Sequence, residues 1–210
     1  MIRRIPLFLA ASLLVLFMAS TAVGATKTAT ETIQHTIDEV LALIKDKDMD
    51  DPATRGQVQK EVEEKVKTIF DFGEFSARTV GAKWRSFTQD QKDRFVDAFA
   101  QLLRATYIEK LDTYNGEKVK FISEVKSTKG DKVEVQTALL LKDKEIPVSY
   151  RLLDKQGQWK VYDVRIEKVS LIENYRGQFK EILMKGDAEE LIKKVVDKAA
   201  EVKQQSTTAK

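Results

Sequence analysis

The stretch Trp159–Phe179, WKVYDVRIEKVSLIENYRGQF, changes its hydrophobic period in the middle without a break. Up to Lys168 apolar and polar residues alternate, which is typical of a strand that buries one face. The apolar face of this strand is expected to hold Tyr162, Val164 and Ile166. From Ser170 apolar residues recur at helical spacing, and Ser170 with Glu173 matches a capping box. The stretch therefore predicts a strand that leads directly into a helix, and this junction sets the angle between sheet and helix.

Three further alternating runs precede this strand. They cover residues 118–125, 133–141 and 146–152, and short polar or glycine-containing segments separate them. Gln156-Gly157 then turns the chain into the strand described above. The pattern predicts a four-stranded antiparallel meander with one apolar face. Pro147 lacks an amide hydrogen, so we expect a sheet edge or a bulge at that position.

Helical periodicity flanks the meander on both sides. Before it, two amphipathic patterns cover residues 33–44 and 52–70, and a longer helix begins at the box Thr88–Gln91 and is expected to end at Asn115-Gly116. After it, the helix from Ser170 ends at Gly186, and a last helix follows. Helices, a meander and further helices predict an α+β domain with the helices packed on one face of the sheet.

The first 25 residues have the layout of a secretory signal peptide. Arg3 and Arg4 precede an apolar run, and a stretch of small residues ends at Ala25. The alternative is a retained membrane anchor, but the run is shorter than the roughly 20 residues that a spanning helix needs. We expect export with cleavage after Ala25, a single domain over residues 26–203, and a loose polar tail over residues 204–210.

Composition excludes several kinds of site. The formal charge of +3 falls to about +1 without the two signal arginines, and charges of both signs are interspersed, so nucleic acid is not an expected partner. The chain has no cysteine and one histidine, His35. A zinc site, a thiol nucleophile or a serine–histidine–acid triad therefore has few residues to use, and we expect neither a metal nor a cofactor.

One carboxylate, Asp71, lies between two phenylalanines, Phe70 and Phe72. A desolvated carboxylate there could act as a general base. A helix cap or an ion-pair partner is the more ordinary interpretation, and we prefer it.

Two blocks of residues together resemble the MlaC family, the periplasmic phospholipid-binding component of the maintenance-of-lipid-asymmetry system, also called the toluene-tolerance auxiliary protein. The first block includes Phe70-Asp71-Phe72, Ser76-Ala77-Arg78, Gly81, Trp84-Arg85, Thr88, Gln91, Phe95, Phe99, Leu102-Leu103, Thr106-Tyr107 and Leu111. The second includes Trp159-Lys160-Val161, Asp163-Val164, Ile166-Glu167, Val169-Ser170-Leu171, Asn174-Tyr175-Arg176 and Gln178-Phe179. Lys168 departs from the pattern, since many members are expected to have glycine there, and this puts a bulge at that point in doubt.

The resemblance implies a cone-shaped fold like that of nuclear transport factor 2, with an apolar cavity between sheet and helices. It also implies a soluble periplasmic carrier that shuttles phospholipid between an outer-membrane lipoprotein complex and an inner-membrane ATP-driven transporter complex. It further implies that the protein is not an enzyme.

Candidate lipid-binding residues are those on the apolar sheet face and on the facing side of the long helix. They are Phe95, Phe99, Leu103, Val135, Leu139, Val148, Tyr150, Tyr162 and Val164. For each of them the alternative is a place in a dry core.

Two other functions stay open from the residues alone. One is an enzyme of the ketosteroid-isomerase type on the same cone-shaped fold, with a buried acid as base and Tyr107 or Tyr150 as electrophile. The other is an envelope chaperone that grips extended polypeptide in the groove. The material bound by the purified protein distinguishes these functions from lipid carriage.

Overall fold

The computed structural model describes residues 27–108, 111, 114 and 116–208. The expected signal peptide, residues 1–25, lies outside this part of the chain. Among the described residues, no helix combines the length and the apolar composition that crossing a membrane requires.

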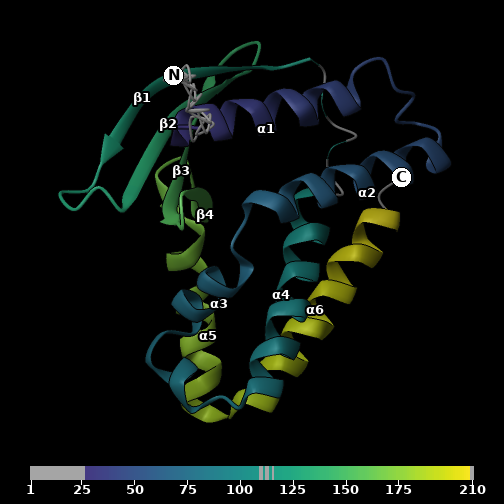
Figure 1. The fold of residues 1–210 in the computed structure, drawn as a ribbon. Helices are drawn as coiled ribbons and strands as arrows, with labels where there is room; N and C mark the ends of the chain where they lie inside the picture. Colours follow the sequence, from purple (N-terminus) through teal and green to yellow (C-terminus); the bar gives the residue numbers. More distant parts are fainter. Residues whose placement is uncertain (1–26, 109–110, 112–113, 115, 209–210) are drawn as a thin grey trace, which may run out of the picture.

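The strands form one antiparallel sheet in the order β1-β2-β3-β4-β5 (Figure 1). Their bounds are β1 Lys118–Lys126, β2 Lys132–Leu140, β3 Glu145–Lys155, β4 Gln158–Ile166 and β5 Val169–Ser170. The first four strands are those that the sequence predicts. The fifth is a two-residue strand that pairs with the end of β4, so the sheet has five strands rather than the expected four.

Two-residue turns set the register on both sides of β4. Gln156 and Gly157 join β3 to β4 with φ values of 57° and 81°, and Glu167 and Lys168 join β4 to β5 with φ values of 49° and 70°. Two successive residues at positive φ are typical of the type I′ hairpin turn, which matches the twist of antiparallel strands. A glycine at position 168 would adopt this conformation freely, whereas Lys168 adopts it at a cost.

Pro147 lies in β3, which has neighbours on both sides, yet its position is locally an edge. The last residue pair between β3 and β4 is Val148 with Ile166, so β4 has already ended where Pro147 lies. The carbonyl of Pro147 accepts a hydrogen bond from Glu167 N at 2.9 Å, in the turn after β4. The side of Pro147 that lacks an amide hydrogen thus faces the turn after β4. The proline therefore costs no backbone hydrogen bond with β2.

The helices are α1 Ala29–Ile44, α2 Pro52–Ile69, α3 Phe72–Val80, α4 Gln89–Tyr107, α5 Leu171–Lys185 and α6 Ala188–Thr208, with a short 3-10 helix η1 at Gly81–Ser86. Side chains cap most of their N-termini. Thr28 and Thr88 form full capping boxes, and Asp51, Asp71 and Ser170 accept hydrogen bonds from backbone amides of the first turn. In Figure 1, α1 lies across the sheet, while α3 to α6 extend away from it.

The long helix α4 is shorter than the sequence suggests. It ends at Tyr107, whereas the pattern predicts a helix through Leu111 to Asn115-Gly116. After Tyr107, the apolar residues Ile108, Leu111 and Tyr114 pack against Ile44 and the α2 residues of the same cluster. Burial against α1 and α2 therefore overrides the helical spacing of these residues.

Three apolar clusters hold the domain together. The largest joins α3, α4, α5 and α6, the second joins α1 to the sheet, and the third joins α1 and α2 to the residues that follow α4. Helices and a sheet meet in one domain, so the α+β prediction is confirmed.

Candidate functional site

A cavity of about 390 Å³ lies where the three apolar clusters meet. Its lining comes from α1, α2, α4, β3 and β4, together with Phe70, Phe72 and Leu171 at the ends of α2, α3 and α5. The volume falls in the range of about 300 to 1,000 Å³ that is usual for small-molecule pockets.

Each of the three helices presents one stripe to the cavity. On α1 the stripe is Ile33, Thr36, Ile37, Val40 and Leu41, and on α2 it includes Glu63, Val66, Lys67 and Ile69. On α4 it is Ala100, Leu103, Arg104 and Tyr107, and Ile108 continues it at the C-cap. The α1 and α4 stripes follow helical periodicity in full, so one face of each of these helices lines the cavity along its length.

The sheet wall consists of Val148 and Tyr150 from β3 with Val161, Val164 and Ile166 from β4. Alternation would put Tyr162 beside Val164. However, the pairing of β3 with β4 shifts by one residue between Arg151 and Leu152, so Tyr150 pairs with Val164 while Leu152 pairs with Val161. This bulge turns Tyr162 away from the cavity. Its ring lies 4.5 Å from the guanidinium carbon of Arg78 on α3.

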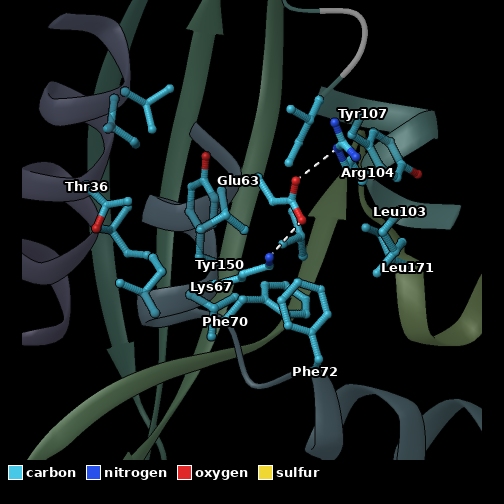
Figure 2. Close-up of a pocket in the computed structure, with 18 of the residues that line it drawn as sticks. Thr36, Glu63, Lys67, Phe70, Phe72, Leu103, Arg104, Tyr107, Tyr150 and Leu171 are labelled. Atoms are coloured by element: carbon cyan, nitrogen blue, oxygen red, sulfur yellow. Dashed lines mark ion pairs between the residues drawn. The ribbon is translucent and has the colours of Figure 1, made fainter. Parts of the chain in front are cut away.

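Three charged side chains form an ion cluster at one side of the cavity (Figure 2). Glu63 Oε2 lies 3.0 Å from Arg104 Nε, and Glu63 Oε1 lies 2.8 Å from Lys67 Nζ. Lys67 Nζ also lies 3.1 Å from Glu64 Oε1. Hydrogen bonds from Lys67 to Glu63 and then to Glu64 raise the pKa of Lys67, so the ammonium group stays charged at neutral pH.

Tyr150 is a polar residue within the sheet wall. Burial raises the pKa of its phenol to about 12, and a hydrogen bond with Thr137 opposes this only in part. The phenol is therefore neutral at physiological pH and supplies no charge to the cavity.

The structure brings four of the nine sequence-predicted residues to the cavity, namely Leu103, Val148, Tyr150 and Val164. The other five lie elsewhere. Phe95 and Phe99 belong to the helical core, where their rings lie 5.5 Å and 5.0 Å from that of Phe179. Val135 is fully buried beneath α1, Leu139 is half-buried outside the cavity, and Tyr162 faces Arg78.

Sequence reasoning missed the contributions of α1 and α2. Their apolar residues have the spacing of any amphipathic helix, and this spacing does not distinguish a cavity wall from a dry core. One usable signal is Arg104, which lies on α4 between the apolar residues Leu103 and Ala105, beside the cavity-lining Ala100 and Tyr107. A charged residue within such a stripe indicates that part of the stripe reaches solvent.

The residues considered for catalysis have structural roles. Asp71 caps α3 by accepting a hydrogen bond from Glu74 N at 2.9 Å, and its other oxygen pairs with Lys155. His35 lies on the exposed side of α1, with Nε2 3.6 Å from Glu39 Oε2. Within the described part of the chain, no group of three or more acidic or histidine side chains is arranged to hold a metal ion.

Three comparisons with known proteins agree with the apolar cavity described above. The structure resembles that of a phospholipid-binding protein from Ralstonia solanacearum solved in complex with a phospholipid, with a TM-score of 0.74, 26% sequence identity and coverage of 84% of this chain and 99% of that chain. The intermembrane phospholipid transport system binding protein MlaC of Haemophilus influenzae is 24% identical over 129 residues, which span 60% of this chain and 60% of that relative. The model of the family described as MlaC protein matches residues 34–197. Because that match covers most of the chain, the protein belongs to the MlaC family.

Proposed function

We propose that this protein is a phospholipid carrier of the periplasm, which holds acyl tails in the cavity between α1, α2, α4 and the sheet. It carries lipid between an outer-membrane lipoprotein complex and an inner-membrane ATP-driven transporter complex. The observation that supports this most directly is the cavity itself, since its wall is apolar except for a few polar side chains such as the ion cluster of Glu63, Lys67 and Arg104.

Such a wall solves the energetic problem of moving a lipid through water. Exposing an acyl chain costs about 0.8 kcal/mol per methylene group, which makes free transit of a two-tailed lipid prohibitive. Inside the cavity the tails meet Ile33, Val148, Val161 and similar side chains, much as they meet other tails in a bilayer. Exchange between the two apolar environments is close to neutral, so the lipid can also be released.

Occupancy of the protein as purified tests the proposal. The protein is purified from a periplasmic extract without detergent, and native mass spectrometry followed by solvent extraction identifies the bound material. We expect phospholipid. Recovery of empty protein that also takes no lipid from vesicles would contradict carriage, and recovery of bound polypeptide would favour a chaperone.

A charged substitution in the wall tests the location of the tails. Val148→Asp places a carboxylate against them, which is expensive enough to exclude lipid. The matched control is Leu139→Asp on the neighbouring strand β2, a half-buried residue outside the cavity. We expect loss of lipid only in the first variant, with both folded by circular dichroism. Full occupancy of a well-folded Val148→Asp variant would place the tails elsewhere.

Asp71→Asn tests the enzymatic alternative. Because Asp71 caps α3 and pairs with Lys155, the change should lower stability slightly and leave lipid uptake intact. Loss of a measurable turnover in this variant would instead identify an enzyme.

Export is tested separately by the intact mass of the protein from the same extract. The expected mass is that of a chain that begins at Thr26. A mass that retains residues 1–25 would contradict cleavage.

A further inference from the structure

We propose that Lys67 and Arg104 form a binding site for the phosphate group of the lipid, and that Glu63 occupies this site as a substitute anion when no lipid is bound. The inference rests on the proposed function and extends it to the headgroup. The group that the site recognises is the phosphodiester anion, irrespective of the alcohol attached to the phosphate.

Exposure indicates which end of the cavity opens to solvent. The side chains of Lys67 and Arg104 are 46% and 37% exposed, and Tyr107 beside them is 39% exposed. Two other lining residues, Ile33 and Val161, are only 1% and 2% exposed. The mouth therefore lies between the C-terminal halves of α2 and α4. A lipid whose tails fill the apolar interior must place its headgroup beside these two cations.

The present contacts show that one anion can bridge the two cations. Glu63 reaches Arg104 with one carboxylate oxygen and Lys67 with the other, at 3.0 Å and 2.8 Å. A phosphodiester shares one negative charge between two non-bridging oxygens on one phosphorus atom, so it can make the same bridge between an ammonium and a guanidinium group.

Arg104 also has a donor that Glu63 does not satisfy. Its Nε is buried and makes no hydrogen bond to any described residue, although Glu63 Oε2 is only 3.0 Å away. The carboxylate oxygen is thus close enough but poorly directed. A phosphate oxygen that arrives from the cavity side can meet this donor, which makes the exchange of Glu63 for phosphate favourable.

Two lipids with identical acyl chains test the site directly, namely phosphatidylethanolamine and the diacylglycerol that lacks its phosphate. Both are presented in the same vesicles, so that attraction of the protein to the membrane affects them equally, and extraction of the reisolated protein gives the uptake of each. The wild-type protein is expected to prefer the phospholipid about tenfold or more, as one charge-assisted contact implies.

Substitutions then separate a phosphate site from a structural ion pair. Arg104→Gln and Lys67→Gln should each reduce phospholipid uptake about tenfold and leave diacylglycerol uptake unchanged. The matched controls are Arg94→Gln on α4 and Lys65→Gln on α2, which break ion pairs with Glu189 and Glu39. Glu63→Gln removes the competing anion, so phospholipid uptake should be kept or increased.

Three outcomes would overturn the inference. Equal uptake of the two lipids by the wild-type protein would exclude recognition of the phosphate. An equal loss of both lipids in Arg104→Gln and Glu63→Gln would show a structural tie between α2 and α4. Binding of inorganic phosphate alone, seen as a thermal shift that Arg104→Gln abolishes, would show a site for free anions. If the wild-type protein takes up neither lipid, the proposed function itself fails.

Discussion

Asp163 Oδ2 accepts a hydrogen bond from Ser170 Oγ at 2.7 Å, and this contact joins the end of the sheet to the start of α5. Asp163 is fully buried, and its Oδ1 accepts a second hydrogen bond from Ile172 N at 3.2 Å. Arg151 Nη1 lies 3.4 Å from Oδ2 and offsets the buried charge. A strand residue thus caps the helix that follows it, and the cavity residue Leu171 is held between the two contacts.

Removal of this carboxylate should be strongly destabilising. Asp163→Ala removes the acceptor of Ser170 Oγ and Ile172 N and one of the two carboxylates that pair with Arg151, the other being Glu134. We therefore expect the free energy of unfolding to fall by about 3 kcal/mol. Chemical denaturation followed by circular dichroism measures the change. The control is Asp187→Ala, which removes an exposed contact to Glu190 N and should cost about 1 kcal/mol. Equal losses in the two variants would show that Asp163 does not hold the junction.

The turn at Glu167-Lys168 offers a stabilising change. Lys168 adopts φ of 70°, which costs a side-chain-bearing residue about 1 kcal/mol relative to glycine. Lys168→Gly removes this strain but adds freedom to the unfolded chain, so we expect a gain of about 0.5 kcal/mol. Thermal unfolding measures it, with the β-branched Lys168→Val as a control that should lower the melting temperature. A lower melting temperature for the glycine variant would contradict the claim that Lys168 is strained in this turn.

Sequence periodicity predicts the sheet and most of the helices because burial on one face has a direct signature. It misses α3, whose nine residues include five with no apolar side chain. The clearest local sign is Asp71, which is identified in the sequence as a possible cap and does cap this helix. In a segment this short, the cap and the packing of Phe75 against Phe99 replace a long amphipathic pattern.

The cavity is predictable only in part, for two physical reasons. The β3–β4 bulge exchanges Tyr162 for Val161 on the cavity wall, and strict alternation cannot show a one-residue shift in pairing. On α4, Phe95 and Phe99 belong to one apolar stripe and Ala100 and Leu103 to an adjacent one. The larger side chains fill the core between helices, and the smaller ones leave room for a cavity.

Alkaline pH should unfold the protein through its buried tyrosines. Burial raises the pKa of Tyr150 and of Tyr175 to about 12, above the ordinary value of 10.0. Both folded and unfolded states are protonated below pH 10.0, so this stability is fully present there and is lost as pH rises toward 12. Each tyrosine contributes about 3 kcal/mol.

Spectroscopic titration of the phenolates together with circular dichroism measures this transition. Tyr150→Phe and Tyr175→Phe should each make the loss of stability above pH 10 less steep. The half-buried Tyr162 and the more exposed Tyr107 provide the comparison, since burial raises their pKa values less strongly. If both phenols ionised near pH 10 in the folded protein, their burial would be contradicted.

Filling the cavity should separate lipid binding from stability. Ala100 and Ala98 lie two residues apart on α4, but Ala100 lines the cavity whereas Ala98 is buried in the core that α4 shares with α5 and α6. Ala100→Leu adds apolar volume to empty space, so we expect reduced lipid uptake and a gain of about 1 kcal/mol in the lipid-free protein. Ala98→Leu inserts the same group into packed core and should cost about 1 to 3 kcal/mol.

Lipid uptake from vesicles and denaturation of delipidated samples measure the two effects on the same preparations. Because residue type, helix and substitution are matched, an opposite sign in stability isolates the cavity as the cause. Undiminished uptake by a stabilised Ala100→Leu variant would show that the tails do not reach this wall, and destabilisation by both changes would show that the space beside Ala100 is already filled by protein.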